Sequence, residues 1–127
     1  MKIHHIAIYV RDLEKTKIFY ETYFGATANT QYHNPKTGLK TYFLSFDGDC
    51  RIEIMEKPNI AESENATEQM GYTHLAFQVG GEEAVDSLTN RLRDAGYEVF
   101  SEPRTTGDGY YESCVSDPEG NRIEIVS

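Results

Sequence analysis

The chain has 127 residues, of which 39% are hydrophobic and 26% charged, and its formal net charge is −9. This length supports one hydrophobic core, and the composition is typical of a soluble globular protein. The negative charge argues against nucleic acid as a partner, because phosphate binding relies on clustered Lys and Arg. We find neither a signal-peptide pattern nor an apolar run of the roughly 20 residues that cross a membrane, so we expect a cytoplasmic protein. Two cysteines, Cys50 and Cys114, are too few for a disulfide framework.

The first half of the chain predicts one strand, one helix and three further strands. Alternating aliphatic residues over Ile3–Val10 indicate a half-buried strand. Asp12 is a suitable N-cap for a helix over about Leu13–Phe24, and Gly25 suits the position after its end. Turn-forming sequences then separate three strand segments, which are Ala26–His33, Lys40–Phe46 and Cys50–Glu56.

The second half predicts the same order of elements. A strand over Thr73–Val79 precedes a helix at about Glu82–Ala95, whose aliphatic residues share one face. Three strand segments follow, which are Glu98–Glu102, Tyr110–Ser116 and Arg122–Val126. The polar, acid-rich stretch between the halves has little periodicity and is interpreted as a linker. We therefore expect a module at about 1–56, a linker at 57–71 and a module at about 72–127, packed as one domain because each half alone is small.

Two short segments recur between the halves. The tetrapeptide at Arg51–Ile54 is repeated letter for letter at Arg122–Ile125, and His5–Val10 resembles His74–Val79. The offsets are 71 residues (from 53 to 124) and 69 residues (from 5 to 74), so a histidine and a glutamate recur together. The chain is therefore two copies of one unit.

Strand alternation gives the repeat a geometry. On each strand the aliphatic residues share one face, and the histidine or glutamate lies on the other, beside a small alanine in the first strand of each unit. Two imidazoles and two carboxylates form a plausible first shell for a divalent metal. The candidate ligands are His5, Glu53, His74 and Glu124.

A second interpretation of these residues needs no metal. A single Glu in a strand usually lies on a solvated face, a single His usually makes an ordinary hydrogen bond, and duplication repeats residues without regard to function. Alternation would place His4 on the face opposite His5, and His33 lies beside a turn. For His4 and His33 we favour a purely structural role.

At this point a resemblance emerges. The first unit contains His5–Leu13, then Phe19-Tyr20 and Phe24-Gly25, and the second contains His74–Phe77 and Asp117–Asn121. Together with the repeated tetrapeptide, these motifs resemble the vicinal oxygen chelate superfamily, which includes glyoxalase I, fosfomycin-modifying enzymes, bleomycin-binding proteins and extradiol dioxygenases. The resemblance covers nearly the whole chain. It implies an α+β fold in which two βαβββ modules form an open, barrel-like mixed sheet around a metal.

Within that superfamily the four candidate ligands match the pattern of glyoxalase I, which takes His and Glu from each module. The match implies a lactoylglutathione lyase-like isomerase that acts on the thiohemiacetal of an α-ketoaldehyde such as methylglyoxal, through an enediolate held by the metal. It further implies nickel, cobalt or zinc, and a homodimer whose subunits share sites. Glu124 is the expected proton shuttle, with Glu53 as its partner.

The pattern also departs from the family. Glutathione-using members carry an arginine where Tyr9 stands, so the thiol is open. Anion contacts or a pocket lining could come from a further set of residues, although each is also an ordinary surface residue: Arg11, Lys40, Arg51, Arg104, Arg122, Tyr110 and Tyr111. The alternative functions are a small-molecule (antibiotic) binding protein and a thiol-transfer resistance protein. Fosfomycin transferases have a similar His, His, Glu ligand pattern, but they lack a carboxylate at the position of Glu53.

Overall fold

The computed structural model of the chain describes residues 1–62 and 70–127. Contacts within the chain divide it into two compact units, residues 1–63 and 64–127. The centre of the expected linker, residues 63–69, lies outside the described residues, and the described positions on either side of it belong to no helix or strand. Each unit is described below by itself.

The first unit begins with a strand and a capped helix. Strand β1 (His5–Tyr9) is followed by α1 (Leu13–Phe24), as the sequence predicts. The Asp12 side chain accepts a hydrogen bond of 2.9 Å from the backbone N–H of Lys15, which otherwise has no partner in the first helical turn. Gly25 ends α1 with φ 65°, a left-handed conformation that glycine adopts without steric cost.

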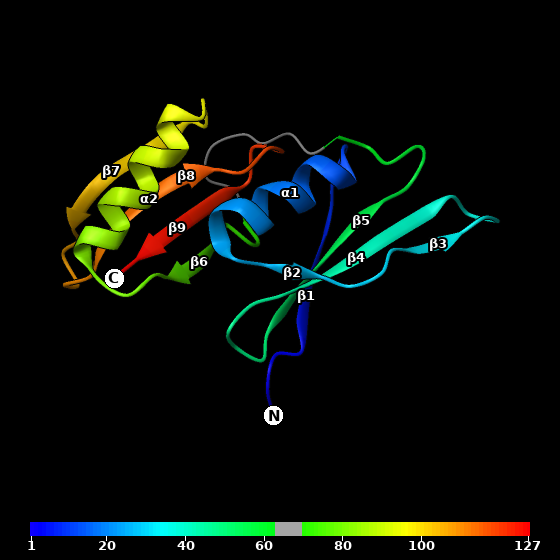
Figure 1. The fold of residues 1–127 in the computed structure, drawn as a ribbon, viewed down its shortest axis with the longest axis horizontal. Coiled ribbons are helices and arrows are strands. Elements are labelled where there is room, and N and C mark those ends of the chain that lie inside the picture. The colour runs from blue at the N-terminus through cyan, green and yellow to red at the C-terminus, as the bar shows by residue number, and fades with distance from the viewer. Residues whose placement is uncertain (63–69) are drawn as a thin grey trace. The chain divides into compact units, whose positions relative to one another are not determined.

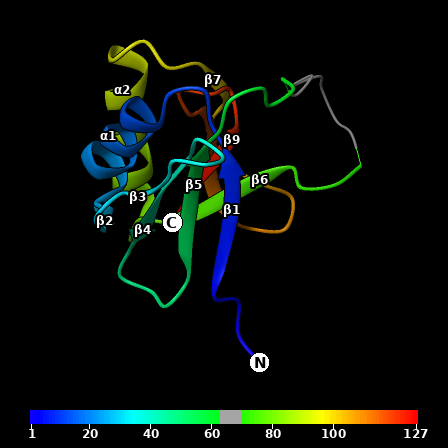
Figure 2. The same ribbon diagram turned by 90° about the vertical axis from the view of Figure 1, so that its right-hand side faces the viewer.

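The remaining strands complete a mixed sheet. They are β2 (Thr27–Ala28), β3 (Tyr32–Asn34), β4 (Leu39–Ser45) and β5 (Arg51–Glu56). The order is β1-β5-β4-β2, with β3 also on β4; β1 runs parallel to β5, and the other pairs are antiparallel. Figure 2 shows β1, β5 and β4 of this sheet.

The expected single strand over 26–33 is wrong in one respect, because the structure divides it into β2 and β3. Both pieces pair with β4, but in different registers: Ala28 faces Leu44, whereas Tyr32 faces Thr41. Between these two pairs, three residues (29–31) on one side oppose two (42 and 43) on the other, which is the signature of a bulge. The two pieces together fill one strand position, so the unit keeps the βαβββ order.

The second unit repeats this plan. It contains β6 (His74–Gln78), α2 (Glu82–Asp94), β7 (Val99–Thr105), β8 (Tyr111–Ser116) and β9 (Arg122–Val126). The sheet order is β6-β9-β8-β7, with β6 parallel to β9, and α2 lies along this sheet (Figure 1). Strand β7 continues to Thr105, beyond the predicted end at Glu102, and includes Pro103. Proline is tolerated there because β7 is the terminal strand of its sheet.

Each unit has its own helix-on-sheet core. In the first unit the buried side chains are Leu13, Phe19 and Tyr20 of α1 with Leu44, Ile52 and Ile54 of the sheet. In the second they are Val85, Leu88 and Leu92 of α2 with Val115, Ile123 and Ile125. The isoleucines of the repeated tetrapeptide thus face the helices, as alternation predicts. The expected α+β class and the two-module plan are confirmed.

The cap of α1 yields a stability prediction. Asp12→Ala removes the acceptor for the N–H of Lys15, so we expect a loss of about 1 kcal/mol in the free energy of unfolding. Urea unfolding followed by circular dichroism measures it. Asp12→Asn retains a capping oxygen and serves as the matched control. Equal stability of the alanine and asparagine variants would contradict a capping role.

Candidate metal centre

The first candidate pair is positioned by the parallel ladder between β1 and β5. In this register Ala7 faces Glu53 and His5 faces Arg51, so His5 and Glu53 are diagonal neighbours on one face of the sheet. Their side chains converge, with His5 Nε2 3.7 Å from Glu53 Oε2. The histidine side chain is 37% exposed and the glutamate side chain 19%. The small Ala7 side chain leaves room between the two strands for this approach.

The second pair is built in the same way. Ala76 faces Glu124 and His74 faces Arg122 in the parallel ladder between β6 and β9. His74 Nε2 lies 3.1 Å from Glu124 Oε2. The repeat in the sequence is therefore a repeat in space, within each unit: both copies turn an imidazole toward a carboxylate across an alanine.

The donor atoms of each pair fit a divalent transition metal. Zinc binds imidazole nitrogen and carboxylate oxygen at about 2.0–2.2 Å, so two such ligands on one ion are about 3.0–3.4 Å apart at angles between 90° and 109°. The pair in the second unit, at 3.1 Å, falls within this range, and the pair in the first unit, at 3.7 Å, is slightly outside it. A small side-chain movement would bring the first pair to ligand spacing as well.

The structure brings the four predicted residues together as two pairs. Over residues 1–62 and 70–127, no group of three or more His, Cys, Asp or Glu side chains gathers at one point. His5 and Glu53 belong to the first unit, and His74 and Glu124 to the second. A four-ligand centre therefore needs donors from both units, and it remains a prediction.

The environment of Glu124 differs from that of a solvated glutamate. Partial burial raises the pKa of its carboxyl above the ordinary value, and the neighbouring His74 opposes that shift. The negative charge of Glu112 adds to the increase in the pKa. A carboxylate whose pKa is shifted toward neutrality is better matched to proton transfer near pH 7.

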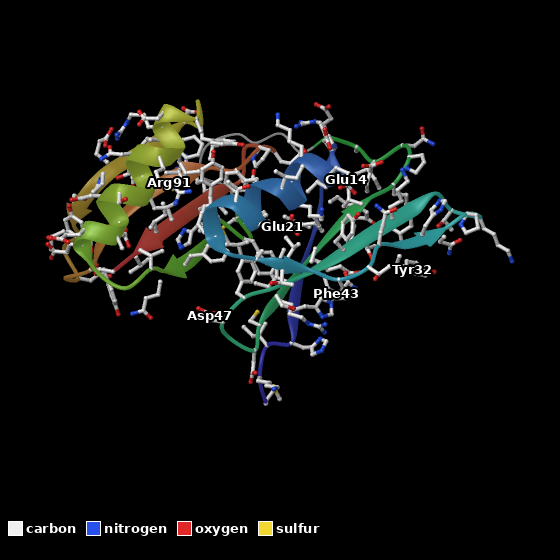
Figure 3. The ribbon with its side chains drawn as sticks, in the orientation of Figure 1. Glu14, Glu21, Tyr32, Phe43, Asp47 and Arg91 are labelled. Atoms are coloured by element: carbon white, nitrogen blue, oxygen red, sulfur yellow. The ribbon has the colours of Figure 1, made fainter. Side chains whose placement is uncertain are left out.

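Each pair is flanked by an arginine stacked on a phenylalanine. The Arg51 guanidinium lies 4.5 Å from the ring centre of Phe43, the residue that faces Glu53 on β4. Figure 3 labels Phe43 on this strand. In the second unit the Arg122 guanidinium lies 4.5 Å from the ring centre of Phe100. Stacking of this kind holds the guanidinium against the sheet while its N–H groups stay available as donors.

The contact of His4 with His5 was not expected from the sequence. Alternation places the two rings on opposite faces, yet His4 Nδ1 lies 2.8 Å from His5 Nδ1, and His4 Nε2 lies 2.8 Å from an Arg51 nitrogen. The reason is that β1 begins at His5, so His4 precedes the strand and does not follow its alternation. The sequence carried a partial signal for this contact, because His4 and His5 are adjacent in the chain and the strand that pairs with β1 contains Arg51. His33 lies on β3 and faces Lys40.

Several other predicted contact residues have partners elsewhere. Arg11 pairs with Glu62 at 3.1 Å, and Lys40 with Glu56 at 3.6 Å. The Tyr111 hydroxyl donates to Asp86 on α2 at 2.7 Å, which places it on the helix side of its sheet. Two further candidates are placed as follows: Arg104 donates to Ser101, and Tyr110 is 57% exposed. Tyr9, which was not among these candidates, is 48% exposed. In β1, Tyr9 alternates with His5 and Ala7 onto the same face.

Comparisons with known proteins agree with this architecture. The YqjT protein of Bacillus subtilis is 28% identical over 98% of both chains. The glutathione transferase FosA of Serratia marcescens is 26% identical, over 97% of this chain and 78% of that one. Among solved structures, a glyoxalase family protein from Enterococcus faecalis superposes with a TM-score of 0.80 at 27% identity, covering 99% of this chain and 97% of that one.

Two βαβββ units that each present an imidazole and a carboxylate define a duplicated α+β fold. The model of one family matches residues 2–125. The chain belongs to the glyoxalase/bleomycin resistance protein/dioxygenase superfamily, and the resemblance noted from its motifs is confirmed. Over residues 1–62 and 70–127, no helix is long and apolar enough to cross a membrane.

The two cysteines differ in a way that labelling can test. Cys50 is exposed. Cys114 lies on β8, is half-buried and faces Glu124 of β9. Burial raises the pKa of the Cys114 thiol, although the Arg122 guanidinium partly opposes the shift. Because the thiolate is the reactive form, we expect Cys50 to react with a thiol-alkylating reagent first and Cys114 about tenfold or more slowly.

Mass spectrometry after timed labelling at pH 8 assigns the two rates. The Cys50→Ser and Cys114→Ser variants serve as controls, since each should leave one kinetic phase. Labelling in urea should bring the two rates together. A Cys114 that reacts as fast as Cys50 in the folded protein would show that its surroundings are open.

Proposed function

We propose that this protein is a metal-dependent isomerase of the glyoxalase I type. It converts the thiohemiacetal of an α-ketoaldehyde, with methylglyoxal as the reference substrate, into a thioester. One observation supports the proposal above the others: both units carry the carboxylate, so Glu53 and Glu124 occupy equivalent positions beside His5 and His74. Membership of the superfamily is consistent with this function and with others.

The four side chains would hold one divalent ion, with nickel, cobalt or zinc the best matches. Imidazole and carboxylate donors suit these borderline metals, and two carboxylates balance the charge of the ion. Coordination positions not used by the protein would be open to substrate. When bound, the ion would supply Lewis-acid stabilisation of the charge that develops on the two neighbouring oxygens of the substrate.

Glu124 is proposed as the proton shuttle. The reaction moves one proton between two adjacent carbons, so a carboxylate that accepts it from the first and returns it to the second leaves atoms and charges balanced. The partial burial of Glu124 and its raised pKa favour this role. Glu53 would act from the other side of the substrate.

We further propose a homodimer in which His5 and Glu53 of one subunit can combine with His74 and Glu124 of the other.

The thiol is the least defined part of the substrate. Tyr9 stands where glutathione-using members carry an arginine, and it is 48% exposed on the strand that holds His5. A phenol offers no positive charge to the carboxylate of glutathione. Activity should therefore be compared among glutathione and other thiols.

A thiol transferase is the second candidate. The similarity to the FosA transferase favours it, since that relative covers 97% of this chain. The presence of Glu53 favours the isomerase, because the transferases of this superfamily have a His, His, Glu ligand pattern that lacks a carboxylate at the position of Glu53. A protein that only binds a small toxic compound is the third possibility.

Metal binding is the first test. We expect near-stoichiometric uptake of nickel, cobalt or zinc after dialysis, and a metal affinity at least about tenfold lower in His5→Ala and His74→Ala, because each removes a ligand. Elemental analysis and competition with a chromophoric chelator provide the measurements. His33→Ala removes an imidazole outside both pairs and should bind metal like the wild type. No uptake of any of the three ions would remove the basis of the proposal.

Thioester formation is the second test. With metal, methylglyoxal and a panel of thiols, the wild-type protein should form a thioester, detected by its ultraviolet absorbance. Glu124→Gln, assayed at saturating metal, should lower kcat by about 10²–10⁴-fold, the usual contribution of a general base. Thiol addition to fosfomycin without any thioester product would favour the transferase instead.

A further inference from the structure

Arg51, His4, His5 and Glu53 form a continuous chain of side-chain contacts in the first unit. An Arg51 nitrogen lies 2.8 Å from His4 Nε2, and His4 Nδ1 lies 2.8 Å from His5 Nδ1. His5 Nε2 then faces Glu53 Oε2 at 3.7 Å. The backbone fixes this arrangement, because the N–H of Arg51 donates to the carbonyl oxygen of His4 at 3.3 Å.

The direction of every hydrogen bond in this chain follows from the arginine. A guanidinium can only donate, so His4 Nε2 must accept. A neutral His4 then carries its proton on Nδ1 and donates it to His5 Nδ1. His5 in turn accepts at Nδ1 and carries its own proton on Nε2, the nitrogen that faces Glu53.

This arrangement conflicts with metal ligation. A histidine that binds metal through Nε2 needs a lone pair there, so its proton must sit on Nδ1. His5 would then donate to His4, and His4 would have to carry its proton on Nε2, directly opposite the Arg51 donor. Two donors 2.8 Å apart cannot share a hydrogen bond, so either the contact between Arg51 and His4 or the contact between His4 and His5 must break.

Among residues 70–127, no histidine connects Arg122 to His74 in this way. Thr73 stands in the position before His74, where the first unit has His4. Arg122 stacks on Phe100 at 4.5 Å, as Arg51 stacks on Phe43, but without an intervening histidine. His74 and Glu124 are also closer together than His5 and Glu53. The two units thus share their ligand residues and differ in what surrounds them.

We propose that Arg51 is a positioning residue that, through His4, holds His5 in the form that does not bind metal. The inference rests on the proposed function, in that His5 is taken as a ligand. The second unit is then the first to engage the ion, and His5 joins only when the chain of contacts from Arg51 through His4 to His5 is broken. Arg51 sets the metal affinity of the first unit without itself touching the metal.

Arg51→Gln is the sharpest test. The glutamine oxygen can accept from His4 Nε2, so the whole chain can reverse and free His5 Nε2. We expect Ni²⁺ or Co²⁺ to bind about 10-fold more tightly, the lower end of the usual effect of residues that contact a ligand from outside the metal shell. Competition with a chromophoric chelator measures the dissociation constant.

Arg122→Gln is the matched control. It removes the same charge from the same tetrapeptide and the same kind of phenylalanine stack, so any tightening due to charge alone should appear in both variants. A second control combines Arg51→Gln with His4→Ala, which interrupts the chain; in that background the effect of Arg51→Gln should fall to that of Arg122→Gln. Equal effects of the two single glutamine variants, or an effect of Arg51→Gln that persists without His4, would overturn the proposal.

Nuclear magnetic resonance tests the same proposal without metal. Long-range proton–nitrogen correlations should show the His5 proton on Nε2 in the wild-type protein and on Nδ1 in Arg51→Gln. The same tautomer in both would refute the role of Arg51. Failure of the proposed function looks different: metal uptake in the wild type would then be absent, or insensitive to His5→Ala.

Discussion

The candidate site depends on the parallel pairing of the first and last strands of each unit. This register places an alanine opposite each glutamate and leaves the histidine as its diagonal neighbour. Because side chains alternate along a strand, a slip of one residue would turn the glutamate toward the helix and an isoleucine toward the histidine. The helices oppose such a slip, since Ile54 and Ile125 are fully buried on the helix side.

Duplication of the unit did not make the two copies equivalent. Both retain the same tetrapeptide and the same ladder, and in both the arginine stacks on a phenylalanine, although Phe43 lies on the strand next to β5 and Phe100 on β7, two strands from β9. They differ at the residue before the histidine, where His4 in one copy corresponds to Thr73 in the other. A single imidazole outside the repeated motif connects Arg51 to His5 and distinguishes the copies chemically.

Much of the fold could be predicted from the sequence because its signals are local. Period-two alternation located most strands, and Asp12 with Gly25 gave the bounds of α1. The repeat also predicted which side of the sheet each glutamate faces. The bulge between β2 and β3 was missed, because the register of a strand is set by its partner and not by its own sequence. His4 was misplaced because alternation holds only inside a strand, and β1 begins one residue later.

The sequence was enough to predict each histidine–glutamate pair, but not whether the two pairs meet at one metal ion. Alternation and register are properties of one sheet, so they bring His5 to Glu53 and His74 to Glu124. Nothing of that kind relates one sheet to another, since the packing of whole units depends on many weak surface contacts. The four-residue centre is therefore a proposal that metal analysis must test.

The separation of packing residues and candidate ligands onto opposite faces of each sheet has an evolutionary consequence. On β5 and β9, isoleucines hold the helix on one side, while the glutamates lie on the other. A substitution at a glutamate or histidine alters the chemistry and leaves the packed layer intact. Lineages built on this plan can lose, exchange or recruit ligands one at a time without first having to survive an unstable intermediate.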